Sequence, residues 1–480
     1  MTGTTEQMPT TDARPEVRAR EPRRAVVLGA GMAGLFAARV LSERYERVTL
    51  IERDPLPAGP GVRRGVPQAR HVHGFQARGV EVVAELFPGL VDEMVEAGAS
   101  RIDDLSEFHF RVTGHLLSQK PMPIAPMLLA SRPYLEYRVR TRLEQRPGIR
   151  FRDCLEVSGL MHETAPAGEV VTGVRVVPPG GGAEDDVPAD LVVDATGRGS
   201  RTPVWLEQLG YERPVEERIA VRVGYASQTL HLDAPSPGGR FVIEGRTPDG
   251  QTGVALFGCE RGTWTFTVLG AEKAFPDQPT REWMLDVAAQ RLPAWAMEVV
   301  RNAEPLGTVV GHRHPASVRR RYDLLDRMPA GLVVVGDAVC AFNPIYGQGM
   351  SVAAEEALSL RTALAQGTDD LAKRTLAGAE ASIVSAWELA AGVDLAYPEV
   401  EGEPSLPMRI ISRYVNRVLT VAEQDPEVAR RFMAVAGLVA PRTAIFQPRV
   451  LGAVLRSAFR RTPPEPAPLP AAGREVTPAL

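Results

Sequence analysis

The sequence predicts an α/β fold in which helices cover a parallel sheet, an antiparallel sheet is inserted, and further helices close the chain. Three observations predict it. Short, wholly apolar runs, typical of strands that are buried on both faces, occur early and late in the chain. A stretch in which polar and apolar residues alternate, typical of an antiparallel sheet, separates them. Helical periodicity prevails after Gly349.

The length and composition exclude several classes of protein. The 480 residues suffice for two or three domains. The net charge of −4 argues against a nucleic-acid partner held through its phosphates. Cys154, Cys259 and Cys340 match no disulfide framework or zinc site, so we expect a reduced, cytoplasmic setting. Residues 1–22 lack the apolar core of a signal peptide, and no run approaches the ~18 apolar residues of a membrane span.

The first ordered elements form a strand–helix–strand unit. Arg24–Leu28 is predicted to be a buried strand, Met32–Tyr45 a helix, and Val48–Glu52 the next strand. Two later apolar runs, Ala189–Ala195 and Gly331–Gly336, have the same character. We therefore expect all of these strands in one parallel sheet.

The segment Ile219–Gly270 has a different pattern. Between Thr263 and Leu269, Trp264 and Phe266 fall on one face of the predicted strand and threonines on the other, which predicts a half-exposed antiparallel sheet. Helices are then predicted over Arg281–Asn302, from Gly349 to about Ala391, and over roughly Met408–Arg461.

These patterns predict a discontinuous first domain with a second domain inserted into it. The expected divisions are a disordered tail 1–22, the first domain in two parts 23–205 and 305–395, the inserted substrate domain 206–304, C-terminal helices 396–461, and a Pro-rich disordered tail 462–480.

A glycine-rich turn joins the first strand to the first helix. In Gly29-Ala-Gly31-Met32-Ala33-Gly34, the first glycine allows the tight turn, the second lets the backbone approach a pyrophosphate, and the third lets helix and strand pack closely. Glu52, followed by Arg53, ends the second strand, where a carboxylate hydrogen-bonds an adenosine ribose and disfavours a 2′-phosphate. The unit therefore predicts a Rossmann-like site for FAD or NAD.

Two further motifs follow buried strands. The first is Asp194-Ala-Thr-Gly-Arg-Gly-Ser200-Arg201, and the second runs from Gly336-Asp337 through Asn343-Pro344-Ile-Tyr346-Gly347-Gln-Gly349-Met350. With the glycine turn and the inserted sheet, their order resembles the FAD-dependent monooxygenases of the aromatic-hydroxylase and squalene-epoxidase-like superfamily. The resemblance covers most of residues 24–395 and implies an FAD-binding domain of the GR2 type. The Asp194 segment departs from the commoner D-G-x-x-S form of that family.

The resemblance implies roles for particular residues. Asp337 would bind the ribityl chain or ribose of FAD, and the turn Gly347–Met350 would bring helix-start amides to the pyrophosphate and the flavin. Arg132, in Ser-Arg-Pro-Tyr-Leu-Glu, matches an arginine that contacts FAD, although a surface arginine at a helix start would look the same. His71 and His73 lie in a segment similar to one beside the flavin ring, and packing roles for them stay open. No Asp, Glu or Cys nearby completes a metal site with them, so no metal is expected.

The chemistry is expected from the flavin, and no catalytic residue is assigned with certainty. Asn343, Pro344 and Tyr346 precede the second glycine turn and are candidates near the flavin; loop formation alone is the alternative for them. On the inserted sheet, the aromatic residues are candidates for an apolar substrate pocket, with ordinary core packing as the alternative. They are Tyr225, Phe257, Trp264 and Phe266.

The resemblance implies a monooxygenase that epoxidises or hydroxylates an apolar natural-product intermediate through a flavin C4a-(hydro)peroxide. The motifs are most similar to bacterial epoxidases and hydroxylases, including those of polyether antibiotic biosynthesis. A flavin-dependent reductase of the geranylgeranyl-reductase type, which shares the fold and cofactor motifs, is the alternative. A flavin halogenase is disfavoured because its Trp-x-Trp-x-Ile-Pro signature is absent, and a non-enzymatic dinucleotide-binding protein would not need the second glycine turn.

The expected partners are O2 and an apolar small molecule. No second strand–Gly-x-Gly–helix unit is present for a nicotinamide nucleotide. Electrons are therefore expected from NADPH or NADH that visits the FAD domain, or from a separate flavin reductase. The C-terminal helices have an apolar–basic spacing that membrane contact could explain. Amphipathic helices that cover the substrate domain are the favoured interpretation.

Overall fold

The structure is a computed structural model that describes residues 23–166, 168–233, 236, 238–247 and 250–459. The expected tails, 1–22 and 462–480, lie outside the described residues, as do the last two residues of the expected helical segment, 460–461. Within the described residues, no helix is both long enough and apolar enough to cross a bilayer.

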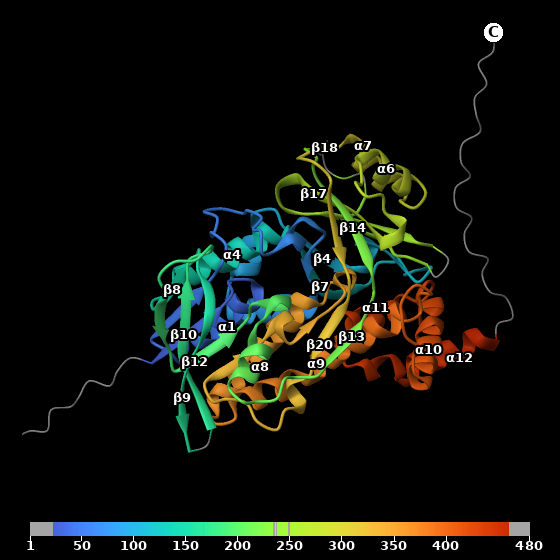
Figure 1. The fold of residues 1–480 in the computed structure, drawn as a ribbon. Helices are drawn as coiled ribbons and strands as arrows, with labels where there is room; N and C mark the ends of the chain where they lie inside the picture. The colour runs from blue at the N-terminus through green and yellow to red at the C-terminus, as the bar shows by residue number, and fades with distance from the viewer. Residues whose placement is uncertain (1–22, 167, 234–235, 237, 248–249, 460–480) are drawn as a thin grey trace, which may run out of the picture.

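A five-stranded parallel sheet with the order β21-β12-β1-β2-β8 is the centre of the first domain (Figure 1). Its strands are β1 (Arg24–Leu28), β2 (Arg47–Ile51), β8 (Ile149–Arg152), β12 (Leu191–Asp194) and β21 (Leu332–Val334). Side chains of β1 alternate between two cores, Ala25 and Val27 on one face, Val26 and Leu28 on the other. Both faces are buried, which is why these strands are apolar throughout.

Helices cover one face of this sheet, and helices together with a small sheet cover the other. The first face carries α1 (Met32–Leu41), α2 (Ala77–Leu86), α3 (Leu90–Glu96), α4 (Arg132–Glu144) and α8 (Gly349–Ala365). The second carries α5 (Thr202–Gln208), α9 (Leu371–Asp394) and the antiparallel strands β9 (Glu156–Ala165), β10 (Gly168–Val177) and β11 (Asp185–Pro188). The predicted α/β fold is confirmed.

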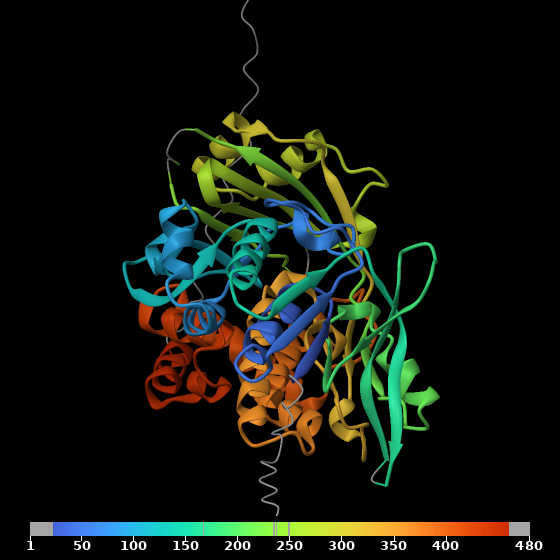
Figure 2. The ribbon, with the colours of Figure 1, turned by 90° about the vertical axis from the view of Figure 1, so that its left-hand side faces the viewer.

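An eight-stranded sheet forms the second domain, in the order β18-β14-β17-β16-β15-β5-β6 with β19 paired to β14. Its strands are β5 (Phe108–Val112), β6 (His115–Leu116), β14 (Val223–His231), β15 (Phe241–Glu244), β16 (Thr252–Gly258), β17 (Thr263–Ala271), β18 (Glu304–Pro305) and β19 (Val310–His314). The sheet therefore includes strands from outside residues 206–304. Figure 2 shows it above the first domain, with α6 (Arg281–Ala289) and α7 (Ala294–Asn302) beside it.

The expectation that this sheet is half-exposed is wrong. Trp264 and Phe266 of β17 pack against α6 and α7 in one core. The threonine face is also buried, because Thr265 is 4% exposed and Thr267 is fully buried. Helices that follow much later in the chain cover the core on that side: α10 (Leu406–Ala422), α11 (Pro426–Ala436) and α12 (Pro448–Phe459).

Two short sheets complete the structure. They consist of β3 (Gly74–Phe75), β7 (Pro123–Leu129) and β4 (Ser100–Asp104), and of β13 (Glu216–Ile219), β20 (Ser317–Arg320) and β22 (Cys340–Ala341). Two predicted helices also differ from the structure. The first helix ends at Leu41 rather than Tyr45, and the helix expected over Arg281–Asn302 is divided into α6 and α7. The division lies at Pro293, which has no amide hydrogen to continue a helical ladder.

Candidate functional site

A cavity of about 1470 Å³ lies between the parallel sheet, the large sheet and the C-terminal helices. Single ligands occupy pockets of roughly 300–1,000 Å³. The cavity is therefore large enough for a cofactor and a second molecule. Of the expected cofactor-binding residues, all except Gly34 line it: Gly29, Gly31, Met32, Ala33, Glu52, Arg53, Arg132, Asp337, Gly347, Gly349 and Met350.

The three glycines of the first turn have different surroundings. A Cβ on Gly34 would lie 1.9 Å from the Gly29 oxygen, so this glycine is required by the packing of the protein itself. Gly29 has a φ of +93°, a conformation that favours glycine. A Cβ on Gly31 would meet no protein atom within 4 Å. Gly31 therefore keeps space free that the protein does not fill.

The second glycine turn has a similar opening. Gly347 has a φ of +65°, and the nearest atom to a Cβ on Gly349 is Asp337 Oδ1 at 4.0 Å. Among the residues that the structure describes, no side chain caps the start of α8 or of α1, so the first-turn amides of both helices are free to bind an anion. Two uncapped helix starts thus meet at one cavity.

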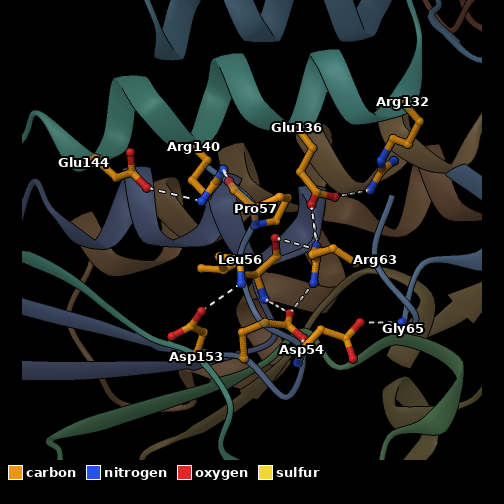
Figure 3. A network of polar contacts seen from close by, with 12 residues as sticks. Asp54, Leu56, Pro57, Arg63, Gly65, Arg132, Glu136, Arg140, Glu144 and Asp153 are labelled. Atoms are coloured by element: carbon orange, nitrogen blue, oxygen red, sulfur yellow. Dashed lines mark hydrogen bonds and ion pairs between the residues drawn. The ribbon is translucent and has the colours of Figure 1, made fainter. Parts of the chain in front are cut away.

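A buried charge network surrounds Glu52. Its Oε2 accepts a hydrogen bond from the Ala30 amide at 2.9 Å and pairs with Arg63 Nη1 at 2.8 Å. Arg63 also bridges to Glu136 of α4, with Nη2 2.7 Å from Glu136 Oε1. Figure 3 shows Glu136 between Arg63 and Arg132, each joined to it by a dashed line. The network holds β2, the following loop and α4 together around the cavity.

Glu52 was predicted from the sequence and Arg132 from the family resemblance, whereas Arg63 and Glu136 were not predicted. Arg63 lies in an irregular loop without a motif, and only the fold brings it to Glu52. Glu136 is four residues after Arg132 on the same helix, which places both on one helix face. That spacing was the available signal for Glu136.

Arg132 retains an unsatisfied group at the cavity. Its Nε is buried without a hydrogen-bond partner in the described chain, and its Nη2 lies 3.5 Å from Glu136 Oε2. Burial lowers the pKa of Arg132, and the charges of Glu136 and Asp337 oppose that effect. Burial also raises the pKa of Asp337, against the charges of Arg132 and Arg198. Both side chains line the same cavity, Arg132 from the start of α4 and Asp337 from the turn that follows β21.

Asp194, in the motif Asp194–Arg201, is held by hydrogen bonds from its own loop and from the start of α5. It is fully buried and accepts hydrogen bonds from the hydroxyls of Thr196, Ser200 and Thr202 at 2.5, 2.5 and 2.6 Å. The Ser200 hydroxyl is therefore engaged within the loop. Arg201 is exposed, lines the cavity and lies over the ring of Trp205.

The two histidines of the Arg-His-Val-His segment line the cavity in neutral form. His71 Nδ1 lies 2.7 Å from Ser227 Oγ, which in turn lies 2.6 Å from Thr267 Oγ1. Burial lowers the pKa of His71 to about 3 and that of His73 to about 4. Ser227 of β14, itself in contact with Thr267 of β17, thus positions His71, a contact that alternation in the sequence did not reveal.

The candidates before the second glycine turn belong to a hydrogen-bonded chain. Asn343, Pro344 and Tyr346 all line the cavity. Asn343 Nδ2 donates to Asp394 Oδ1 at 2.9 Å, and the Tyr346 hydroxyl donates to the same oxygen at 2.6 Å. Burial raises the pKa of Asp394 to about 6. Asp394, the last residue of α9, had no sequence signal.

The aromatic candidates on the large sheet divide into two pairs. Tyr225 and Phe257 line the cavity. Trp264 and Phe266 do not: they lie on the opposite face, in the core formed with α6 and α7. The expectation that these two line the substrate pocket is wrong, because β17 turns its even-numbered side chains away from the cavity.

Residues 23–379 match the family model of an FAD binding domain. The chain belongs to the FAD-dependent monooxygenase superfamily. Protein Rv3254 of Mycobacterium tuberculosis is 37% identical over 426 residues, which cover 85% of this chain and 88% of the relative. Kynurenine 3-monooxygenase of Salinispora tropica is 29% identical over 357 residues, covering 71% and 72%.

A solved flavin enzyme has the same fold. p-Nitrophenol 4-monooxygenase PnpA of Pseudomonas putida superimposes with a TM-score of 0.59 at 16% identity, covering 88% of this chain and 99% of that chain. At this identity the likeness concerns the fold alone.

The site fits the FAD of this superfamily. Gly31 and Gly349 leave open space at two uncapped helix starts, as a pyrophosphate requires. Arg132 offers an unpaired buried donor, and Asp337 lines the same cavity. Glu52 retains acceptor capacity on Oε1, which receives only the Asp54 amide at 3.0 Å.

Proposed function

We propose that this monooxygenase inserts one oxygen atom of O2 into an apolar small molecule, by hydroxylation or epoxidation, while two electrons from NADPH or NADH and two protons reduce the other oxygen atom to water. The observation that carries the proposal is a single cavity that joins the glycine cradle to an apolar compartment. The compartment is walled by Phe241, Phe257, Leu269, Ile411, Val415 and Leu419. An intermediate with an alkene, such as a polyene of polyether assembly, is one substrate of this class.

FAD, when bound, supplies the reduction and activation of O2. The residues that would hold it are the glycines of both turns, Glu52, Arg132 and Asp337. The positive end of α8 and the guanidinium of Arg132 provide a field that stabilises negative charge at this part of the cavity. The apolar side chains from the large sheet and the C-terminal helices limit the water beside a bound molecule, and Asn343 and Tyr346 orient that molecule.

The test uses the purified full-length chain. We expect a yellow protein with bound FAD that consumes NADPH or NADH, directly or with an added flavin reductase. A panel of alkenes and polycyclic aromatics is then supplied under ¹⁸O2, and products are examined by mass spectrometry. Incorporation of one labelled oxygen atom supports the proposal.

Two results would contradict it. Addition of two hydrogens to a substrate without labelled oxygen would identify a reductase. A colourless protein that takes up no FAD would remove the cofactor from the proposal altogether.

A further inference from the structure

The imidazole of His73, the residue before β3, is held in one tautomer. Its Nδ1 lies 2.9 Å from the carbonyl oxygen of His71. A carbonyl oxygen only accepts, so Nδ1 carries a proton and donates it. Burial and the nearby charge of Arg132 lower the pKa of His73 to about 4, so the ring is neutral at pH 7. A neutral imidazole has a single N–H, and Nε2 therefore carries only a lone pair.

The Nε2 atom of His73 is open to the cavity. The side chain is half-buried and lines the cavity. Within the part of the chain that the structure describes, Nε2 has no hydrogen-bond partner, yet it is not sealed from solvent as the unpartnered Nε2 of His71 is. The adjacent Gly74 is paired with Leu129 of β7, which fixes the backbone at this point. The lone pair is thus held in place and available to a ligand.

The groups around this acceptor are hydrogen-bond donors. Arg132 is close enough for its charge to lower the pKa of His73, and its Nε is buried without a partner among the described residues. Gln76 donates its Nε2 to the Tyr346 oxygen at 2.7 Å, which joins the His73 segment to the turn before the uncapped start of α8. A ligand with acceptors alone, such as a phosphate, would satisfy these donors and leave the His73 lone pair facing oxygen. The arrangement favours a ligand that carries an N–H or O–H group beside acceptor oxygens.

The flavin half of FAD has this chemistry. Its ring carries an imide N–H between two carbonyl oxygens, and its ribityl chain carries hydroxyls. We propose that His73 Nε2 accepts a hydrogen bond from the imide N–H or a ribityl hydroxyl of FAD, while Arg132 and the α8 amides bind the oxygens beside that group. The inference goes beyond the proposed function, because it assigns a cofactor-binding residue whatever molecule is oxidised.

The first experiment compares variants of the full-length chain from which FAD has been removed. Fluorescence titration measures the affinity for FAD and needs no turnover. His73→Leu removes the acceptor, whereas His73→Gln retains one in its amide oxygen. The net value of one hydrogen bond corresponds to roughly 2- to 10-fold in affinity, so His73→Leu should bind FAD more weakly by that factor and His73→Gln should recover part of the loss. His162→Leu, at an exposed position of β9 outside the cavity lining, is the matched control and should bind FAD as wild type does.

The second experiment identifies the donor with analogues of FAD. 3-Methyl-FAD lacks the imide proton, and the 2′-, 3′- and 4′-deoxy forms each lack one ribityl hydroxyl. Wild type should bind one of these four analogues more weakly than FAD, and His73→Leu should discriminate less against that analogue. The changed bulk of the analogue is the same for both proteins, so the difference in discrimination isolates the hydrogen bond. Loss with 3-methyl-FAD identifies the imide, and loss with a deoxy form identifies that hydroxyl.

Equal affinity of wild type for FAD and all four analogues would overturn the proposal. So would a His73→Leu variant with unchanged FAD affinity or unchanged discrimination, or a His73→Gln variant that binds FAD no better than His73→Leu. His73→Phe, which keeps a ring without an acceptor, takes the place of His73→Leu if that variant does not fold. A protein that binds FAD through His73 but transfers no labelled oxygen contradicts the proposed function alone, whereas a chain that binds no FAD overturns both.

Discussion

Two glycines of the first turn differ in what a side chain would disturb: at Gly31 it would enter the cavity, and at Gly34 it would clash with the protein backbone. Gly31 and Gly34 belong to one motif, yet a Cβ at Gly31 meets no protein atom within 4 Å and one at Gly34 would lie 1.9 Å from a backbone oxygen. The backbone of Gly31 has a φ of −75°, which any residue can adopt. The space at Gly31 is therefore open to a ligand.

We expect Gly31→Ala to weaken FAD binding by roughly tenfold or more while the thermal midpoint of the FAD-free protein stays within a few degrees of wild type. Fluorescence titration with FAD and a thermal melt measure the two quantities. Gly34→Ala is the matched control, and it should lose solubility or stability. An unchanged FAD affinity in Gly31→Ala would contradict the assignment of this turn.

Glu356 of α8 is a buried carboxyl that predicts a pH dependence of stability. It accepts a hydrogen bond from the Gly336 amide, and burial raises its pKa from 4.5 to about 8. Between these values the unfolded chain releases a proton that the native chain keeps. This group therefore makes the native state less stable as pH rises through that window, by up to about 1.4 kcal/mol per pH unit.

Glu356→Gln keeps the acceptor oxygen and removes the titration. We expect the variant to gain stability relative to wild type as pH rises from about 4.5 to about 8, with no further gain above that range. Urea unfolding of both proteins across this range measures the difference. Parallel stability curves for the two proteins would show that Glu356 does not titrate in the native state.

The large sheet has two buried faces: one packs against α6 and α7, and the other lines the cavity. The even-numbered residues of β17 pack on α6 and α7, whereas Phe257 of the neighbouring β16 lines the cavity. Phe266→Ala is expected to destabilise the protein by about 3–5 kcal/mol and to leave the affinity for 2-naphthol, a polycyclic aromatic probe, unchanged.

Phe257→Ala is the matched change on the cavity side, and it should alter the affinity for 2-naphthol in calorimetry. Chemical unfolding measures the stability of both variants. If Phe266→Ala changed the probe affinity while Phe257→Ala did not, the assignment of the two faces would have to be exchanged.

For the molecule as a whole, the C-terminal helices close the cavity and supply part of its mouth. Ile411 of α10 lines the cavity and is 47% exposed, whereas the adjacent Ile410 is 57% exposed and is not part of the lining. A ligand that enters past α10 would therefore meet Ile411 and not Ile410.

Ile411→Trp should narrow this entrance and slow the association of 2-naphthol several-fold, because the larger ring occupies the mouth. Ile410→Trp should leave association unchanged. Stopped-flow mixing of each FAD-loaded variant with the probe measures the rates. Equal rates in wild type and both variants would place the entrance elsewhere.

Part of this structure could be predicted from the sequence because it depends on short-range backbone geometry. The strand at Arg24–Leu28, the glycine turn and the start of the first helix depend on short-range rules, and the structure has them where the sequence predicts. Glu52 was predicted from its spacing after the glycine turn, whereas Arg132 and Asp337 were predicted because their motifs resemble those of the superfamily. The side chains of β17 do alternate as predicted, but the threonine face, which was expected to be exposed, is buried.

The sequence alone determined the first strand–turn–helix unit, four strands of the parallel sheet and the helical character of the chain after Gly349, because backbone geometry and apolar periodicity act over a few residues. Only the tertiary structure decided which faces are covered and which charges meet. Arg63 reaches Glu52, Ser227 reaches His71, and Asp394 reaches Asn343 because the fold brings distant segments together. Such contacts depend on packing between elements, and no local pattern in a single chain encodes them.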